Sequence, residues 1–221
     1  NFEFSRMLAE ILKALSLLKT RLILMGTAAE YGFVPETILP INENQETNPY
    51  SLYGRTKLKQ TDYFISGEAK PLNYIIIRPF NIYGPGMPDY LSISNFVKQI
   101  KVINLKRGSN DQYLDVGNLQ VKRDFLYVKD FIKIVWELSQ NENAYNGIYN
   151  VCSGKPLSLE KIVEYVINLS GENISIRQNK DRLRENDMAV HFGCNRQMLE
   201  LISDIEFTPW RLGIEAMFNE S

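Results

Sequence analysis

The sequence of 221 residues is poor in the side chains that build metal centres and disulfide frameworks, because it holds only two cysteines and one histidine. Two cysteines are too few for the disulfide framework of a small secreted domain. We therefore expect Cys152 and Cys194 to be thiols in a reducing cytoplasm. With His191 as the single histidine, the sequence gives little support for a transition-metal site, and we expect no bound metal.

Long hydrophobic runs and an excess of charge of one sign are also missing. The longest continuous apolar stretches, at 22–25 and 74–77, are far too short to cross a bilayer. The 25 Lys and Arg residues nearly balance the 26 Asp and Glu residues, and no basic run is present. Such a balance argues against a dedicated nucleic-acid-binding protein. We therefore expect neither a membrane nor a nucleic acid as partner.

Short apolar runs alternate with amphipathic helical patterns along the chain. We expect loops at 79–88 and a tail after residue 202. The apolar runs predict buried strands, and the amphipathic patterns predict helices. In the first of these helices the apolar residues form a single stripe at 7–18. The predicted strands are 22–25, 74–78 and 147–152, and the other main helices are 50–65, 92–106, 129–139 and one that begins at Ser158. Continuous apolar runs between helices are typical of a parallel sheet, so the sequence predicts an α/β layer fold.

The segments that follow the first two predicted strands are where a ligand site is expected. In layered α/β folds, ligands bind beyond the carboxyl ends of the parallel strands. These ends lead into residues 26–50 and 79–90, so residues that carry chemistry should lie there.

Tyr53 and Lys57 are four residues apart in an expected helix, and this spacing places the phenol and the ammonium on one face. A free tyrosine has a pKa of about 10, which a nearby ammonium lowers toward the working range. Such a pair can exchange a proton with a carbonyl or hydroxyl oxygen, and the lysine can also hold the hydroxyls of a ribose. By itself, the spacing equally fits an ordinary solvated helix face.

Three motifs around this pair carry a resemblance to a known family. They are Gly26-Thr27-Ala28-Ala29-Glu30-Tyr31-Gly32 after the first strand, Asn48-Pro49-Tyr50-Ser51 before the pair, and Arg78-Pro79-Phe80-Asn81-Ile82-Tyr83-Gly84-Pro85-Gly86 after the second strand. In this order they resemble the extended short-chain dehydrogenase/reductase family, which contains nucleotide-sugar epimerases, dehydratases and reductases.

The resemblance implies a role for each residue that matches the family's motifs. Tyr53 would be the catalytic acid or base, and Lys57 its partner, which also grips the nicotinamide ribose. Thr27 would hydrogen-bond the reacting sugar oxygen, although taken alone it is a plain strand-end hydroxyl. Pro79 and Phe80 would join Tyr53 and Lys57 in binding the NAD(P)H cofactor.

Later segments resemble the branch of this family that acts on GDP-sugars. The matching segments are 114–125, 150–155 and 181–187. The resemblance implies that Asn81, Arg123 and Arg184 face the nucleotide diphosphate, for which guanidinium groups are well suited. Arg123 could instead pair with Asp124 or Asp130, and Arg184 could be a solvated loop charge.

Two features depart from the family's pattern. Dehydratases of the family carry an acid pair directly after the threonine, but Ala28 and Ala29 stand there, and Glu30 comes one residue too late. This counts against dehydration and leaves reduction or epimerisation. The Gly-x-x-Gly-x-x-Gly loop that cradles a dinucleotide pyrophosphate is absent. In the family it lies upstream, so we expect a preceding segment, in line with the lack of Met at position 1.

The resemblance predicts a doubly wound (Rossmann-type) parallel sheet, truncated at its N-terminus, with a smaller α/β substrate domain. Residues 1–84 would be the C-terminal part of the Rossmann domain, and 121–154 would return to it. Residues 85–120 and 155–221 would form the substrate domain.

The expected activity is NAD(P)H-dependent reduction of the 4-keto group of a GDP-4-dehydro-6-deoxy sugar, as in GDP-rhamnose synthesis, by a homodimer. A nucleotide-sugar 4-epimerase with bound NAD is an alternative, because it uses the same three residues. A further alternative is a non-catalytic fragment or pseudoenzyme, since the chain lacks the dinucleotide loop.

Overall fold

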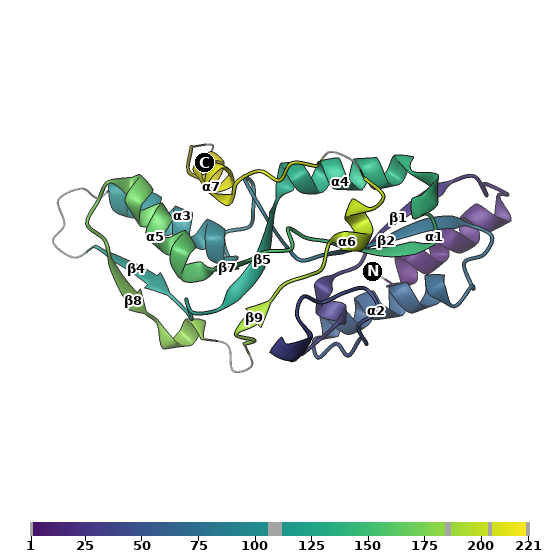
Figure 1. The fold of residues 1–221 in the computed structure, drawn as a ribbon, viewed down its shortest axis with the longest axis horizontal. Coiled ribbons are helices and arrows are strands. Elements are labelled where there is room, and N and C mark those ends of the chain that lie inside the picture. Colours follow the sequence, from purple (N-terminus) through teal and green to yellow (C-terminus); the bar gives the residue numbers. More distant parts are fainter. Residues whose placement is uncertain (1, 106–111, 184–186, 203–204, 220–221) are drawn as a thin grey trace.

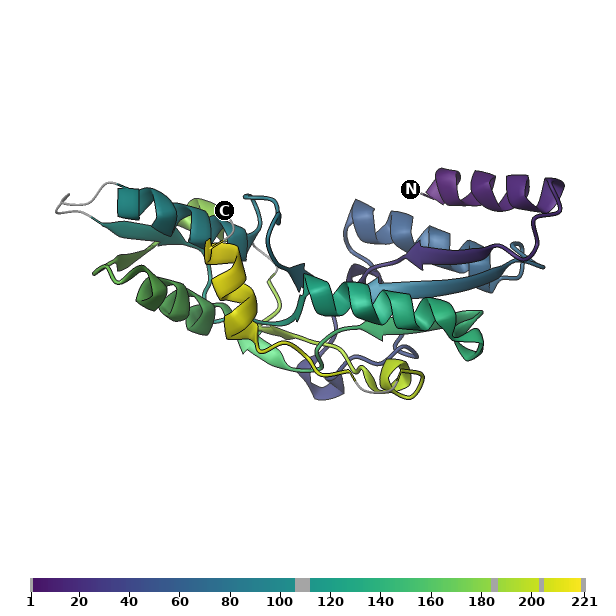
Figure 2. The same cartoon turned by 90° about the horizontal axis from the view of Figure 1, so that it is seen from above.

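A three-stranded parallel sheet forms one half of the molecule. In the computed structural model, which describes residues 2–105, 112–183, 187–202 and 205–219, the strand order is β1-β2-β6 (Figure 1). The strands are β1 (Arg21–Met25), β2 (Asn73–Pro79) and β6 (Gly147–Val151). Helices α1 (Phe2–Ala14) and α2 (Leu52–Ile65) cover one face, and α4 (Val128–Gln140) and α6 (Arg196–Leu199) cover the other (Figure 2). The predicted α/β fold with a parallel sheet is therefore confirmed.

The central strand β2 explains why its sequence is a continuous apolar run. Successive side chains of a strand point to opposite faces. Tyr74 and Ile76 pack with α1 and α2 in one core cluster, and Ile75 and Ile77 pack with α4 and α6 in another. Because both faces of β2 are buried, its sequence does not alternate between apolar and polar residues. This is the pattern expected for a strand of a parallel sheet.

Among the described residues, the other half of the molecule contains two small sheets and three α-helices. Strand β5 (Lys122–Tyr127) pairs with β3 (Asn81–Tyr83), β7 (Pro156–Ser158) and β9 (Val190–His191), and β4 (Tyr113–Val116) pairs with β8 (Ser175–Gln178). Helices α3 (Ser92–Leu105), α5 (Leu159–Ser170) and α7 (Trp210–Asn219) share one core cluster, which includes Phe96, Ile162 and Ile214. The division into the expected domains and their boundaries stays a prediction.

Helix α5 begins where the sequence places its start. The hydroxyl of Ser158 accepts a hydrogen bond from the backbone N–H of Lys161, at 3.3 Å. This bond satisfies one of the N–H groups that the first turn of a helix leaves without an intrahelical partner. The helix ends at Gly171, whose left-handed backbone (φ +69°) glycine adopts without strain.

Two local expectations are wrong, and a third holds only in part. The expected loop at 79–88 contains strand β3, and the expected tail contains helix α7. Both lack a long periodic pattern, and their order comes from tertiary pairing with β5 and with the core of α3 and α5. The expected stripe of the first helix faces the core only in part, because Leu12 is buried and Leu8 packs against the core whereas Met7 and Ile11 are exposed.

No helix among the described residues is long and apolar enough to span a bilayer.

Candidate functional site

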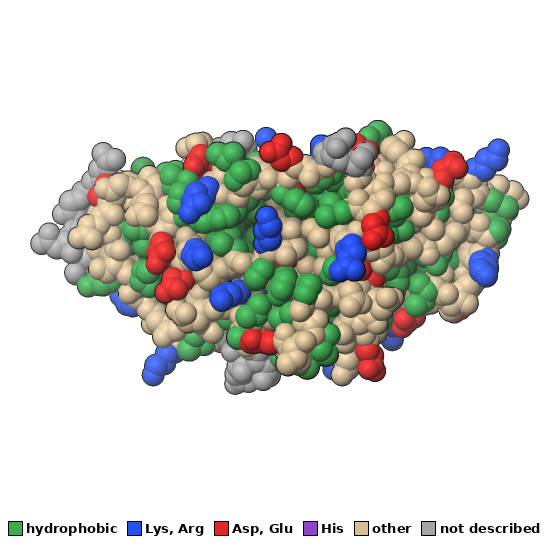
Figure 3. Space-filling view, viewed as in Figure 1, with side chains coloured by type: hydrophobic (Ala, Val, Ile, Leu, Met, Phe, Trp, Pro, Cys, Tyr) green, Lys and Arg blue, Asp and Glu red, His purple; other side chains and the backbone are tan. Residues whose placement is uncertain are grey.

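A cleft of about 870 Å³ lies between the β3–β5 strands and helix α3. Four of the residues expected to bind cofactor or substrate line it: Tyr53, Phe80, Asn81 and Arg123. The face in Figure 3 shows apolar side chains in the middle of the molecule with Lys and Arg side chains around them. The structure therefore brings residues from three separate motifs of the sequence to one hollow.

Tyr53 lies in the first turn of α2, and its ring lines the cleft with about half of its surface exposed. The turn is fixed by Ser51, whose hydroxyl accepts a hydrogen bond from the Gly54 N–H at 3.0 Å. This N-cap holds the start of the helix at a defined place. The phenol of Tyr53 can thus be reached by a ligand in the cleft.

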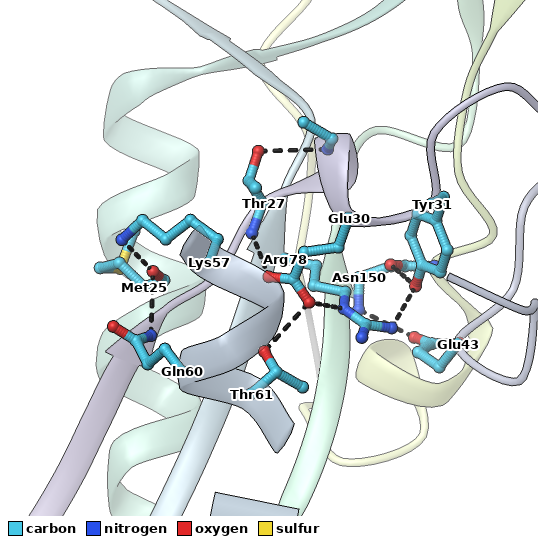
Figure 4. A network of polar contacts seen from close by, with 11 residues as sticks. Met25, Thr27, Glu30, Tyr31, Glu43, Lys57, Gln60, Thr61, Arg78 and Asn150 are labelled. Atoms are coloured by element: carbon cyan, nitrogen blue, oxygen red, sulfur yellow. Dashed lines mark hydrogen bonds and ion pairs between the residues drawn. The ribbon is translucent and has the colours of Figure 1, made fainter. Parts of the chain in front are cut away.

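Lys57 lies one helical turn after Tyr53, as the spacing predicts. Its Nζ donates a hydrogen bond to the backbone carbonyl of Met25, at the carboxyl end of β1, at 2.5 Å (Figure 4). Burial lowers the pKa of the Lys57 ammonium, against the opposing effect of the Glu30 charge. An ammonium carries three N–H donors, so two more are available for the hydroxyls of a ligand.

Thr27 is the N-cap of a short 3-10 turn (Ala28–Glu30) that follows β1. Its Oγ1 accepts a hydrogen bond from the Ala29 N–H at 3.2 Å. A hydroxyl that is engaged as an acceptor keeps its hydrogen for donation. Thr27 is therefore prepared to donate to an oxygen acceptor such as a carbonyl.

Directly behind Thr27, the carboxylate of Glu30 is the centre of a buried network (Figure 4). One oxygen accepts from the Thr27 N–H at 3.0 Å, and the other accepts from Thr61 Oγ1 at 3.0 Å and from Arg78 Nε at 2.9 Å. Glu30 and Thr61 are fully buried, and Arg78 nearly so. Buried charges persist when they are paired and hydrogen-bonded.

The network continues from Arg78 to the loop after the turn. Arg78 Nη1 donates to the Tyr31 hydroxyl at 3.1 Å, and this hydroxyl donates to Asn150 Oδ1 at 2.7 Å. Burial raises the pKa of Tyr31 to about 12, although the positive charge of Arg78 opposes this change. Tyr31 is therefore a neutral hydrogen-bonding group, and it joins the turn to β6.

Arg123 forms an ion pair with Asp187 across the wall of the cleft. The expected alternative partners are engaged elsewhere. Asp124 accepts hydrogen bonds from backbone N–H groups of Ser153 and Gly154, and Asp130 accepts from Thr208. The pairing of Arg123 with Asp124 or Asp130 is thus wrong.

The remaining predicted site residues have different surroundings. Asn81 donates through Nδ2 to the backbone carbonyl of Asp124 at 2.9 Å. Pro79 ends β2 beside Val151 of β6 and is not among the residues that line the cleft. Arg184 lies outside the described residues.

Phe80 owes its position in the cleft to two residues that follow much later in the sequence. Its ring lies 5.2 Å from the ring of His191, centroid to centroid. A Cβ atom on Gly193 would come within 2.6 Å of the Phe80 ring and 2.7 Å of Cys152 Sγ. A side chain at position 193 would therefore displace Phe80.

Among the site residues that were given no role from the sequence are Glu30, Asp187 and Arg182. Glu30 is the hub behind Thr27, Asp187 pairs with Arg123, and Arg182 lines the cleft while it donates to Asn95 Oδ1 at 2.6 Å. Only Glu30 could have been found from the sequence. It lies between a buried strand and a tyrosine, and an arginine stands at the end of the next strand, which together favour a buried ion pair.

Comparison with known proteins shows which family this chain is similar to. A protein-family model described as the NAD dependent epimerase/dehydratase family matches residues 1–152. GDP-6-deoxy-D-mannose reductase from Pseudomonas aeruginosa is 32% identical over 155 residues, which are 70% of this chain and 50% of that protein. GDP-6-deoxy-D-talose 4-dehydrogenase from Aggregatibacter actinomycetemcomitans is 26% identical over 205 residues, which are 92% of this chain and 66% of that protein.

A solved structure shows the same fold. The structure of RMD from Pseudomonas aeruginosa complexed with NADPH has a TM-score of 0.85 at 24% sequence identity, and the match covers 95% of this chain and 69% of that one. The chain thus spans about half to two thirds of the length of these curated relatives. With the family model matched over residues 1–152, the chain belongs to the NAD dependent epimerase/dehydratase family.

Proposed function

We propose that this chain is part of an NAD(P)H-dependent reductase that converts the 4-keto group of a GDP-4-dehydro-6-deoxy sugar to a hydroxyl. The observation that carries the proposal is the placement of Tyr53 at the cleft, one helical turn from Lys57 and in the same hollow as Arg123. The two curated relatives described above are named as enzymes of GDP-6-deoxy sugars, which supports the choice of substrate.

The residues present fit a nicotinamide cofactor at the carboxyl ends of β1 and β2. Lys57 donates one N–H to the Met25 carbonyl. Within the described part of the chain, its two other N–H groups remain for the two ribose hydroxyls. Phe80 and Pro79 would form the apolar side of this site. When bound, the reduced nicotinamide would supply the hydride that adds to C4 of the sugar.

The protein side of the reaction is a proton transfer to the C4 oxygen. Thr27 would donate a hydrogen bond to the keto oxygen and hold it in place, since its oxygen accepts from the Ala29 N–H and its hydrogen remains for donation. Tyr53 would give its phenolic proton to this oxygen, and the nearby Lys57 ammonium would stabilise the phenolate that remains. The keto group, one hydride and one proton together give the hydroxyl.

Arg123 and Asn81 would bind the nucleotide diphosphate, with Arg184 as a further candidate. In the structure Arg123 is paired with Asp187. The diphosphate would either displace the Asp187 carboxylate from the guanidinium or bind the same guanidinium beside it.

Two further proposals concern the protein's surroundings. A homodimer would form through α2, the helix that carries Tyr53 and Lys57, as the resemblance to the family implies. Helix α1, which packs beside α2, would also take part. A cytoplasmic location agrees with the two cysteines, both of which are free thiols in the structure.

The test is an assay of NADPH oxidation with GDP-4-dehydro-6-deoxymannose by the full-length protein and its Tyr53→Phe variant. The variant lacks the proton donor, so we expect its kcat to fall by about 10²- to 10⁴-fold, the usual contribution of a positioned acid. Unchanged turnover in Tyr53→Phe would refute the assignment of the acid. Tightly bound NAD in the purified protein, with no need for added reductant, would instead identify a nucleotide-sugar 4-epimerase.

A further inference from the structure

The carboxylate of Glu30 connects the turn that carries Thr27 with the helix that carries Tyr53 and Lys57. Its three hydrogen-bond donors come from different elements: the Thr27 N–H from the turn, the Thr61 hydroxyl from α2 and the Arg78 guanidinium from β2. Figure 4 shows these groups converging on the one carboxylate. Leaving an oxygen of a buried carboxylate without its hydrogen-bond donor costs free energy. The hydrogen bonds to Glu30 therefore hold the three elements together.

The hydrogen bond from Thr61 holds α2 in place on the same side of the helix that carries Tyr53 and Lys57. Tyr53, Lys57 and Thr61 follow one another at spacings of four residues, so they lie along one side of α2. The hydroxyl of Thr61 is fully buried and lies 3.0 Å from Glu30 Oε2. A shift or rotation of α2 would lengthen this bond.

Two close approaches show that the arrangement leaves little room. A Cβ atom on Gly26 would come within 2.7 Å of Glu30 Oε1. A Cβ atom on Gly54, in the first turn of α2, would come within 2.7 Å of the Ala29 carbonyl oxygen. The turn and the helix therefore come close at Gly54, and Gly26 leaves the space that the Glu30 carboxylate occupies.

We infer that Glu30 is a positioning residue, whose carboxylate sets the place of the Thr27 hydroxyl relative to Tyr53 and Lys57 through Thr61. This inference rests on the proposed function, in which these three side chains act on one oxygen. The role of Glu30 is thus separate from that of an acid or base, because its oxygens are occupied by donors and it is shielded from the cleft.

Direct replacement of Glu30 leaves Arg78 buried without its counter-charge and can prevent folding. The test therefore uses Thr61→Val, which removes one donor and keeps the size and branching of the side chain. Thr61→Ser restores the hydroxyl. Thr56→Val is the matched control, because Thr56 lies on the same helix and its hydroxyl donates only within that helix, to the Leu52 carbonyl at 2.8 Å.

The first measurement is the steady-state kinetics of the full-length protein. We expect Thr61→Val to lower kcat by about 10- to 100-fold with KM changed less than about threefold, because small displacements of reacting groups reduce rate more than binding. We expect Thr61→Ser and Thr56→Val to stay within about twofold of wild type. A Thr61→Val enzyme with wild-type kcat would overturn the inference.

The second measurement does not require activity. Amide hydrogen exchange in residues 26–31 should become about tenfold faster in Thr61→Val, whereas exchange in β2 should not change, since the loosening is local. Unchanged exchange in 26–31, or equal acceleration in β2, would overturn the inference. If wild type turns over none of the nucleotide sugars offered but residues 26–31 loosen as expected, the proposed function fails, whereas the coupling of the turn to α2 through Glu30 and Thr61 stands.

Discussion

At the scale of the residue, burial decides the charge of His191. The side chain is 8% exposed and lies against the ring of Phe80. Burial, with the positive charge of Arg123 as a second cause, lowers the pKa of His191 from 6.5 to about 4. The imidazole is therefore neutral at pH 7 and acts as part of the wall behind the cleft.

This shift predicts that acid destabilises the protein through His191. Between pH 6.5 and about 4, the unfolded chain binds a proton that the folded protein does not, so the free energy of unfolding decreases as the pH falls. At pH 5 the loss relative to pH 7 should be about 2 kcal/mol from this residue.

Guanidinium denaturation of wild type and His191→Gln at pH 7 and pH 5 measures the effect. Other groups titrate equally in both proteins, so the difference between their losses belongs to His191. We expect the variant to lose about 2 kcal/mol less than wild type. Equal losses would contradict the prediction.

At the scale of the element, the first turn of α2 depends on a residue without a side chain. Gly54 is buried where the helix meets the turn after β1, and an added Cβ would lie 2.7 Å from the Ala29 carbonyl oxygen and 2.9 Å from Pro49 Cβ. Helix propensity alone would favour alanine there by about 1 kcal/mol. The backbone contact works against this preference.

We expect Gly54→Ala to destabilise the protein by a net amount of about 1–2 kcal/mol, because the overpacking cost exceeds the gain in helix propensity. The helix should also move away from Thr27, which lowers kcat. Chemical denaturation measures the first effect, with Thr56→Ala on the same helix as the control, for which we expect a change within about 0.5 kcal/mol. A Gly54→Ala protein as stable and active as wild type would show that α2 can move without consequence.

At the scale of the whole molecule, helix α1 leaves an apolar stripe uncovered by the described part of the chain. Phe4, Met7 and Ile11 of α1 are each at least half exposed, as is Leu15 directly after the helix. α1 packs beside α2, and the proposed homodimer would cover this stripe with the same stripe of a second copy, as two-fold symmetry requires.

We expect light scattering to give a dimeric mass for the full-length protein and a monomeric mass for the double variant Met7→Lys, Ile11→Lys, because two charges would be buried without partners at the interface. Ile132→Lys is the control, since this side chain is equally exposed on α4, away from α1. A double variant that remains dimeric would exclude α1 from the interface.

The sequence by itself determined the parallel sheet and the residues of the motifs. Continuous apolar runs such as 74–77 have few ways to be buried other than between two layers of helices. The spacing of Tyr53 and Lys57 needs only the geometry of one helix. The family resemblance, which adds Thr27, Asn81 and Arg123, rests on local motifs of the same kind.

Only the tertiary structure decided which side chains are partners. Glu30 becomes a hub because Thr61 and Arg78, 31 and 48 residues away, arrive at one carboxylate, and Arg123 meets Asp187 rather than its neighbours Asp124 and Asp130. Strand β3 and helix α7 are likewise ordered by contacts with distant segments. Local patterns report propensity and periodicity, whereas these pairings depend on how the chain closes its long loops, which no short window of sequence contains.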